Sequence, residues 1–273
     1  MVKITKVLNN NAVIIKDQGQ EKIAMGTGVG FEKGKNDTVN QDKIEKLFVL
    51  NENEKLQQLF ERIPEEHLSL TEEIIRHAEK SLDVQLGDHI LLALTDHISF
   101  AIERAQEGIH LQNKLLQEIK LLYHKEFEIG LWGLQLINER MGVNMPADEA
   151  AFIALHLHTM KVEGGDVREV VKQTSMIRDM VDTIKNTLNI EIQEEDISYD
   201  RLIAHLRFAL VRATEYDVHS MDRDILKMIK KKYTKSFNCA KLVADQVYNA
   251  YGVHLPEEEQ GYIALHIERL QQF

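Results

Sequence analysis

Four histidines recur at matched positions of a duplicated sequence, and they are the side chains best suited to chemistry in this chain. His97 and His205 stand in the pattern H-x-x-F-A-[IL]-x-R, at a shift of 108 residues. His156 and His266 stand in two I-A-L-H blocks, at a shift of 110 residues. Of the 12 histidines, only these four fall inside the matched blocks. His110 and His219 could be paired at a shift of 109, but only with a gap in the unmatched segment. We therefore treat the four matched histidines as candidate functional residues.

A neutral imidazole can ligate a metal, transfer protons or accept a phosphoryl group. A zinc site needs further Cys or carboxylate ligands, and we find no such constellation recurring around these histidines, nor an H-E-x-x-H motif. No catalytic residue, metal or cofactor is therefore expected, and an enzyme is disfavoured. Half-buried structural histidines remain an alternative. Arg104 and Arg212 follow His97 and His205 by seven residues, on the same helical face, and are candidates to pair with a phosphoryl group.

The duplication itself predicts the architecture around the histidines. Residues 119–158 and 229–268 share 13 identities in 40 positions, where average residue usage would give roughly two or three. The sequence has only 3 prolines and long segments with apolar residues at helical spacing. Each copy is therefore predicted to be a helical bundle, with one histidine on its second helix and one on its last.

Five helices are predicted in each copy. In copy one they begin near residue 68, cover 91–102 with an end near residue 108, cover 111–124 and 130–140, and begin again at residue 146. Copy two repeats them between residues 167 and 270.

The first 50 residues differ from the rest in pattern and charge. Short β-branched runs at 2–8, 12–16, 21–25 and 44–50 predict four strands, with turns at 9–11 and 17–20 and a glycine loop at 26–31. These 50 residues have a net charge of +2, whereas the whole chain has −11. A nucleic-acid contact is thus more plausible here than in the acidic remainder. So small a β module has a thin core, which favours dimerisation.

The predicted fold is a small antiparallel β N-terminal module followed by two tandem all-α helical bundles. The expected domains are 1–56, 66–166 and 167–273, with a polar connector at 51–66 that contains part of a helix. One cysteine, Cys239, fits a reducing cytoplasm. The sequence has no apolar run of 18 residues, so membrane insertion is not expected.

Several motifs in combination resemble one known family. They are K-V-L-N-N-N at 6–11, G-x-G-x-x-F at 26–31, D-K-I-E-K-L-F at 42–48, T-D-H at 95–97 and the two I-A-L-H blocks. The whole chain resembles the BglG/SacY-type transcriptional antiterminators of bacteria, which carry two phosphotransferase-system regulation domains. A DNA-binding activator with the same regulatory repeats would need an N-terminal helix-turn-helix, whereas residues 1–50 are predicted to form strands.

The resemblance implies a cytoplasmic homodimer whose N-terminal module binds an imperfect RNA hairpin overlapping a terminator. The positions that match the family's RNA contacts are Asn9, Asn11, Gly26, Thr27 and Phe31, and Lys6 lies nearby as a further candidate. Without the resemblance, Phe31 would be read as a core residue. The resemblance also implies phosphorylation at His97, His156, His205 and His266. A sugar-specific phosphotransferase transporter component would inhibit through copy one, and the phosphocarrier HPr would activate through copy two.

Overall fold

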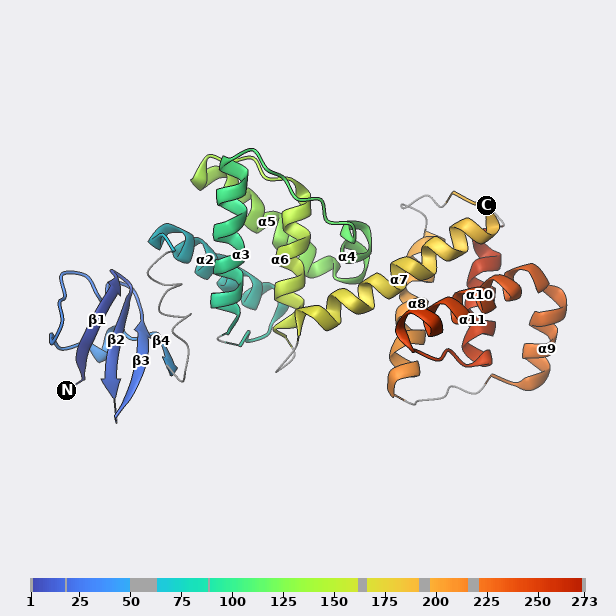
Figure 1. Ribbon diagram of the computed structural model, residues 1–273, viewed down its shortest axis with the longest axis horizontal. Helices are drawn as coiled ribbons and strands as arrows, with labels where there is room; N and C mark the ends of the chain where they lie inside the picture. The colour runs from blue at the N-terminus through green and yellow to red at the C-terminus, as the bar shows by residue number, and fades with distance from the viewer. Residues whose placement is uncertain are drawn as a thin grey trace. The chain divides into compact units, whose positions relative to one another are not determined.

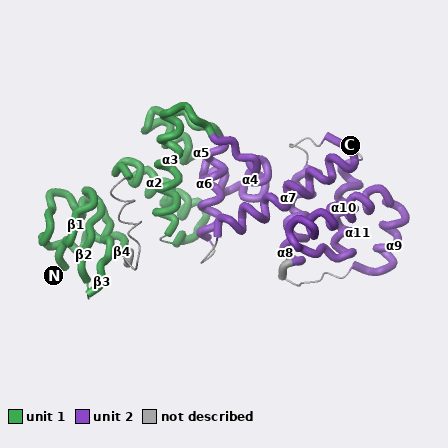
Figure 2. The backbone as a smooth tube through the Cα atoms, in the orientation of Figure 1, with its two compact units in different colours: residues 1–110, 132–146 green, residues 111–131, 147–273 purple. Residues whose placement is uncertain are grey.

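The computed structural model describes residues 2–17, 19–49, 63–87, 89–161, 166–191, 197–215 and 221–271. Within this part, a four-stranded antiparallel sheet is followed by ten α-helices, α2 to α11 (Figure 1). This confirms the predicted fold class. The chain divides into two compact units, residues 1–110 with 132–146, and residues 111–131 with 147–273 (Figure 2). The predicted module end at residue 56 lies outside the described residues, and the domain boundaries stay predictions.

The sheet runs β1-β2-β3-β4 in sequence order. Its strands are β1 (Lys3–Asn9), β2 (Ala12–Asp17), β3 (Gln20–Met25) and β4 (Lys46–Val49), and all neighbours are antiparallel. The module has an apolar core of Ile4, Val13, Ile15 and Ala24 from the strands, with Val29 and Val39 from the loops. Ala12, Ile14, Ile23 and Met25 are buried as well, so β2 and β3 bury residues on both faces of the sheet. The four predicted strands are confirmed, with β4 beginning two residues later than expected; residue 50 lies outside the described part.

The glycine loop after β3 packs against the segment before β4. A Cβ on Gly26 would lie 1.8 Å from the carbonyl oxygen of Lys43, at the end of the short 3-10 helix η1 (Gln41–Lys43). Gly28 has φ +66°, a left-handed conformation that side chains disfavour. These two glycines let the loop fold closely over the edge of the module.

Copy one contains five helices. They are α2 (Glu65–Leu82), α3 (His89–Gln106), α4 (Leu116–Leu122), α5 (His124–Met141) and α6 (Ala147–Thr159). In α2 the buried residues Leu70, Ile74 and Ala78 recur at helical spacing. In unit 1, a Cβ on Gly133 of α5 would lie 3.1 Å from Ile74, so a glycine there permits close packing onto α2.

The predicted third and fourth helices of copy one have wrong boundaries. Residues 111–115 are not helical, because the side chain of Asn113 accepts a hydrogen bond from the backbone N–H of Leu115 at 2.9 Å, which forms a local turn instead. α5 begins at residue 124 and passes through Gly130, which was expected to start the helix. A Cβ there would lie 2.3 Å from the carbonyl oxygen of Ala150 on α6. Gly130 therefore permits a close helix crossing.

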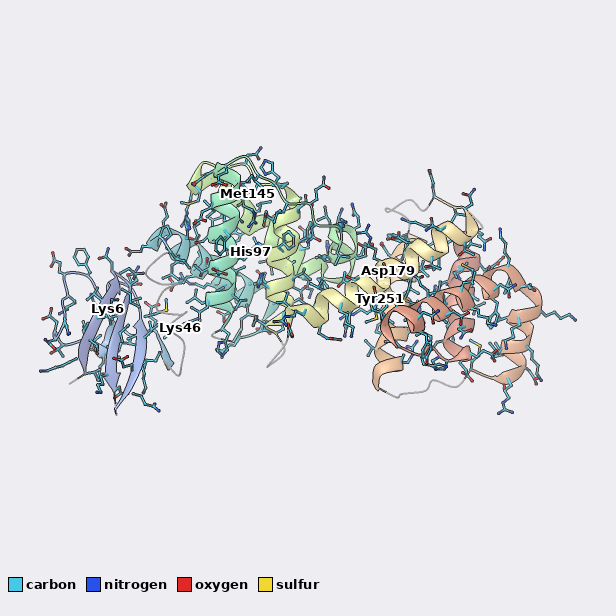
Figure 3. The ribbon with its side chains drawn as sticks, viewed as in Figure 1. Lys6, Lys46, His97, Met145, Asp179 and Tyr251 are labelled. Carbon is cyan, nitrogen blue, oxygen red and sulfur yellow. The ribbon has the colours of Figure 1, made fainter. Side chains whose placement is uncertain are left out.

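Copy two also contains five helices, as predicted. They are α7 (Val167–Leu188), α8 (Ile197–Glu215), α9 (Arg223–Lys232), α10 (Thr234–Tyr251) and α11 (Glu257–Leu270). Their buried residues form a continuous core that includes Met180, Leu206, Val243 and Ile263. Figure 3 labels Tyr251 on α10, whose hydroxyl donates a hydrogen bond to Asp179 on α7. Burial and this carboxylate raise the pKa of Tyr251 to about 12.

Candidate functional site

The first β-hairpin and the glycine loop form one surface, organised by Asn11. Its side-chain Oδ1 accepts a hydrogen bond from the backbone N–H of Gly28 at 2.6 Å. Its backbone carbonyl accepts one from Gly26 at 3.0 Å. Asn9 completes the turn, because its Oδ1 accepts from the N–H of Asn11 at 2.9 Å. The structure thus brings Asn9, Asn11 and Gly26 together, three of the positions that the sequence singles out.

The aromatic ring of this surface faces solvent. Phe31 is 56% exposed, which contradicts the core role that its sequence context alone would suggest. Thr27 belongs to the same loop, and both its backbone N–H and its hydroxyl donate to Glu45, at 3.2 and 3.1 Å. Thr27 is therefore held by a carboxylate.

Lys43 is a basic residue of this surface that the sequence analysis does not single out. The Lys43 Nζ lies 3.5 Å from the position that a Cβ on Gly28 would take, so its ammonium stands beside the glycine loop. The signal was present, because Lys43 lies in the D-K-I-E-K-L-F motif. Lys6, by contrast, is paired with Ile14 along the β1–β2 ladder and is exposed on the strand (Figure 3). The structure places Lys6 on the strand that leads to the loop, not within the loop.

A carboxylate of the first helical turn reaches the asparagine turn within unit 1. Glu65 of α2 accepts hydrogen bonds from the side-chain amides of Asn10 and Asn11, at 2.9 and 2.8 Å. Glu65 therefore holds one N–H of each of these two amides.

The two histidines of copy two meet face to face. His205 lies on α8 and His266 on α11, and their rings are stacked with centroids 3.8 Å apart and an interplanar angle of 28°. This confirms that the second and last helices of the copy carry the matched histidines, and it shows that the two side chains share one site.

The environment keeps both rings neutral. Burial lowers the pKa of His205, and the charges of Arg212 and Arg269 lower it further. Burial, the neighbouring His205 and the charges of Arg269 and Arg201 lower the pKa of His266 to about 4. Near pH 7 each ring therefore keeps one nitrogen with a free lone pair, the form that attacks an electrophile.

A buried ion pair adjoins the stacked rings. Arg212 donates from Nε to Glu259 Oε1 at 2.7 Å and from its terminal nitrogen to Oε2 at 2.6 Å. The Glu259 side chain is 4% exposed, so it is almost fully desolvated. The expectation that no carboxylate recurs near the histidines is therefore wrong. The signal was the match between Glu149 and Glu259 in the two copies.

The histidines of copy one lie on the corresponding helices. His97, which is labelled in Figure 3, and Arg104 belong to α3 in unit 1. His156 and Glu149 belong to α6 in unit 2. Both copies thus keep two histidines, one arginine and one glutamate at matched positions of matched helices.

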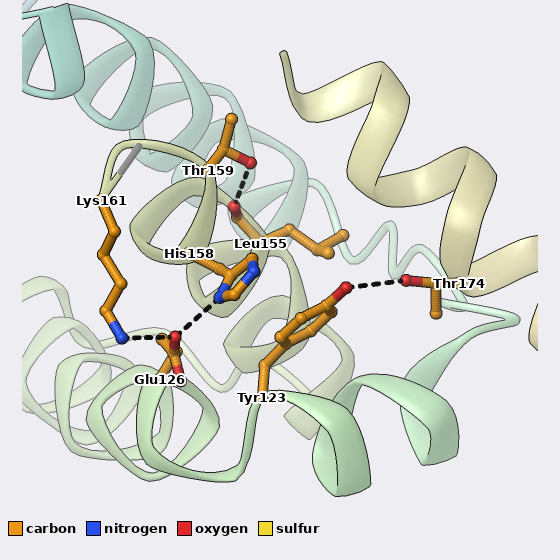
Figure 4. Close-up of polar contacts among 7 residues, drawn as sticks. All are labelled: Tyr123, Glu126, Leu155, His158, Thr159, Lys161 and Thr174. Atoms are coloured by element: carbon orange, nitrogen blue, oxygen red, sulfur yellow. Dashed lines mark hydrogen bonds and ion pairs between the residues drawn. The ribbon is translucent and has the colours of Figure 1, made fainter. Parts of the chain in front are cut away.

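A second polar cluster supports the end of α6. Glu126 accepts hydrogen bonds from His158 Nδ1 and Lys161 Nζ, both at 2.8 Å (Figure 4). The rings of Tyr123 and His158 lie 4.0 Å apart, and the Tyr123 hydroxyl lies 3.5 Å from Thr174 Oγ1. Burial alone would raise the pKa of Glu126, but the hydrogen bonds from His158 and Lys161 lower it to about 2.

Copy two uses a different pair at these positions. Ser236 matches Glu126 and Glu268 matches His158, and the Ser236 hydroxyl donates to Glu268 at 2.6 Å. In copy one the carboxylate lies on α5, whereas in copy two it lies on the last helix, α11. In both copies a hydrogen bond still links the fourth helix to the last. A supporting role explains why His158 need not be a histidine in both copies.

Within the described residues, no three His, Cys, Asp or Glu side chains gather as a metal site would require. No helix in the same residues is long and apolar enough to cross a bilayer.

Comparison with known proteins identifies the domains. Residues 2–57 match the CAT RNA binding domain, and residues 72–160 and 178–270 each match the PRD domain. The chain is 39% identical to the "Beta-glucoside operon antiterminator" of Dickeya chrysanthemi, over 99% of this chain and 97% of that protein. It is 36% identical to the "Transcription antiterminator LicT" of Bacillus subtilis (strain 168), over 98% of this chain and 99% of that protein.

A solved structure, that of GlcT CAT-PRDI, matches with a TM-score of 0.51 and 34% sequence identity, covering 59% of this chain and 98% of that one. The relatives are named as regulators of transcription and not as enzymes. This chain belongs to the family of RNA-binding transcriptional antiterminators that join a CAT domain to two PRD domains regulated by phosphotransferase-dependent phosphorylation.

Proposed function

We propose that the β module binds an RNA hairpin overlapping a transcription terminator, and that binding lets polymerase read on. The observation that carries this proposal is the exposed ring of Phe31 beside a loop fixed by Asn11. RNA is read mainly where unpaired bases are splayed out, stacked on aromatic rings and hydrogen-bonded by amides. Lys43 adds a positive charge for the phosphate backbone.

Equilibrium RNA binding by the full chain tests this proposal. Stacking of one base contributes about 1–3 kcal/mol, so Phe31→Ala should weaken hairpin binding about tenfold. Phe100→Ala is a matched control, because Phe100 is also exposed but lies on α3. Equal affinity of wild type and both variants for the hairpin would contradict the assignment.

We infer that the active form is a homodimer. The core cluster of the module consists of six buried residues, which is small for independent stability. Sedimentation of the full chain with and without hairpin RNA tests this inference. Dimers should form in the RNA-bound sample, and an RNA complex that contains one chain would contradict it.

The stacked histidines of copy two suit a phosphoryl acceptor, and we propose phospho-HPr as the donor. A neutral ring nitrogen forms an N–P bond while the donor's N–P bond breaks, and the bonding electron pair leaves with the donor imidazole. Incubation with phospho-HPr followed by peptide mass spectrometry should place phosphate on His205 or His266. Unmodified peptides after complete discharge of the donor would contradict this proposal.

Copy one is proposed to receive the opposite signal. A sugar-specific transporter component would phosphorylate His97 or His156 when its sugar is absent and so inhibit RNA binding, with the chain acting in the cytoplasm. Because one relative is named for a beta-glucoside operon, a β-glucoside uptake operon is the first target to test. Antitermination should persist without sugar in His97→Ala and His156→Ala strains, and unchanged sugar dependence in both would contradict this role.

A further inference from the structure

Two arginines flank the stacked histidines of copy two from different helices. Arg201 precedes His205 by four residues on α8, so the two side chains share one helix face. Arg269 follows His266 by three residues on α11 and shares its face in the same way. Because the two rings are 3.8 Å apart, the two arginines lie on the two helices that meet at one site. Both are exposed and can move.

The charge of each arginine affects the pKa of the histidine on the other helix. The charge of Arg269 lowers the pKa of His205, and the charge of Arg201 lowers the pKa of His266. Both guanidinium groups therefore lie close enough to act across the contact between α8 and α11.

These two arginines differ from Arg212 in what holds them. Arg212 is fixed by both oxygens of the buried Glu259, and breaking such a pair leaves a desolvated charge behind. Among the described residues, Arg201 and Arg269 form no ion pair with a carboxylate. Arg201 and Arg269 can therefore pair with a phosphoryl group without first breaking an ion pair among the described residues.

The duplication shows that this pair is specific to copy two. At the shifts that align the histidines, Arg201 corresponds to Ala93 and Arg269 to Thr159. Thr159 is 2% exposed and donates to the carbonyl oxygen of Leu155 at 2.7 Å, so it is a core residue. Both copies keep the histidines and the arginine–glutamate positions, and only copy two adds two exposed guanidinium groups.

We propose that Arg201 and Arg269 together bind the phosphoryl group carried by His205 or His266 and so tie α8 to α11. Their absence from copy one gives the two copies opposite responses to the same modification. This inference rests on the proposed function, in which these histidines accept a phosphoryl group.

The physical contrast follows from charge. A phosphoryl group adds about two negative charges and three acceptor oxygens. In copy two these oxygens meet two planar guanidinium forks, which pair well with phosphate. In copy one Ala93 and Thr159 stand at these two positions, so the same charges meet neither fork and are left less compensated. Phosphorylation then tightens copy two and loosens copy one.

The test replaces both arginines with the residues of copy one. The full chain is phosphorylated by phospho-HPr or by phosphoramidate, from which a ring nitrogen takes the phosphoryl group while ammonia leaves. The pH midpoint of each phosphohistidine signal is followed by ³¹P NMR, with signals assigned by His205→Ala and His266→Ala. Nearby cations disfavour proton uptake, so the copy-two midpoint should be about 1 pH unit higher in the double variant Arg201→Ala, Arg269→Thr than in wild type.

Arg223→Ala, which removes an exposed arginine on α9, is the matched control and should leave the midpoint unchanged. Phosphorylation should also raise the melting temperature of wild type and of this control, but not that of the double variant. A midpoint unchanged in the double variant overturns the inference while leaving phosphorylation itself intact. A wild-type chain that takes phosphate from neither donor overturns the proposed acceptor role and the inference with it.

Discussion

Glu126→Gln should destabilise the chain in a way that depends on pH. The pKa of Glu126 is lowered to about 2 from the usual 4.5 of a glutamate, and its side chain is 6% exposed. A difference of about 2.5 pH units, at 1.36 kcal/mol each, corresponds to about 3 kcal/mol of stability. Because the folded-state pKa is the lower one, this stability is fully present above pH 4.5 and is lost as the pH falls towards 2.

The gap between wild type and Glu126→Gln should therefore be about 3 kcal/mol at pH 7 and about 2 kcal/mol at pH 3.5. Urea unfolding at both pH values can be followed by the fluorescence of Trp132, the one tryptophan of the chain, which lies on the same helix α5. Glu128→Gln is the matched control, because Glu128 lies two residues after Glu126 on α5 and its side chain is exposed. A gap that does not change with pH, or an equal loss in the control, would refute this reasoning.

Glu65→Gln should tighten RNA binding several-fold, because the carboxylate that occupies the amides of Asn10 and Asn11 loses its charge; a titration in which the variant binds no better than Glu66→Gln would contradict this. The unfolding free energy of copy two should fall as the pH is lowered from about 6.5 to about 4, because the pKa of His266 is lowered to about 4 in the fold; calorimetry of His266→Gln should show a flatter pH dependence. Gly26→Ala should unfold the β module, because the added Cβ would lie 1.8 Å from a carbonyl oxygen; native circular dichroism and RNA binding would argue against it.

The sequence predicts the parts of this molecule that depend on local pattern. Alternating β-branched residues predict the four strands, and helical spacing predicts that matched histidines lie on the second and last helices of each copy. Gly130 is the instructive error. Glycine is usually read as a helix boundary, but here it lies inside α5 because the Ala150 carbonyl approaches it closely.

Contacts between distant residues could not be predicted in the same way. Glu259 lies 47 residues from Arg212, and Lys43 lies beside Gly28 only because the loop folds over η1. The repeat did hold a usable signal for Glu259, since a buried glutamate matches it in copy one. No pattern in the sequence distinguishes an exposed Phe31 from a buried one, because that depends on which way the loop turns.

Transcription read-through with purified polymerase tests the central claim most directly. The template would carry a hairpin and terminator from the β-glucoside operon of a relative, and the product measured is the full-length transcript. The full chain should increase read-through, and Phe31→Ala should abolish most of the increase while Phe100→Ala leaves it intact. Termination that is unaffected by a folded wild-type chain which binds the same hairpin would contradict the assignment of this chain as an antiterminator.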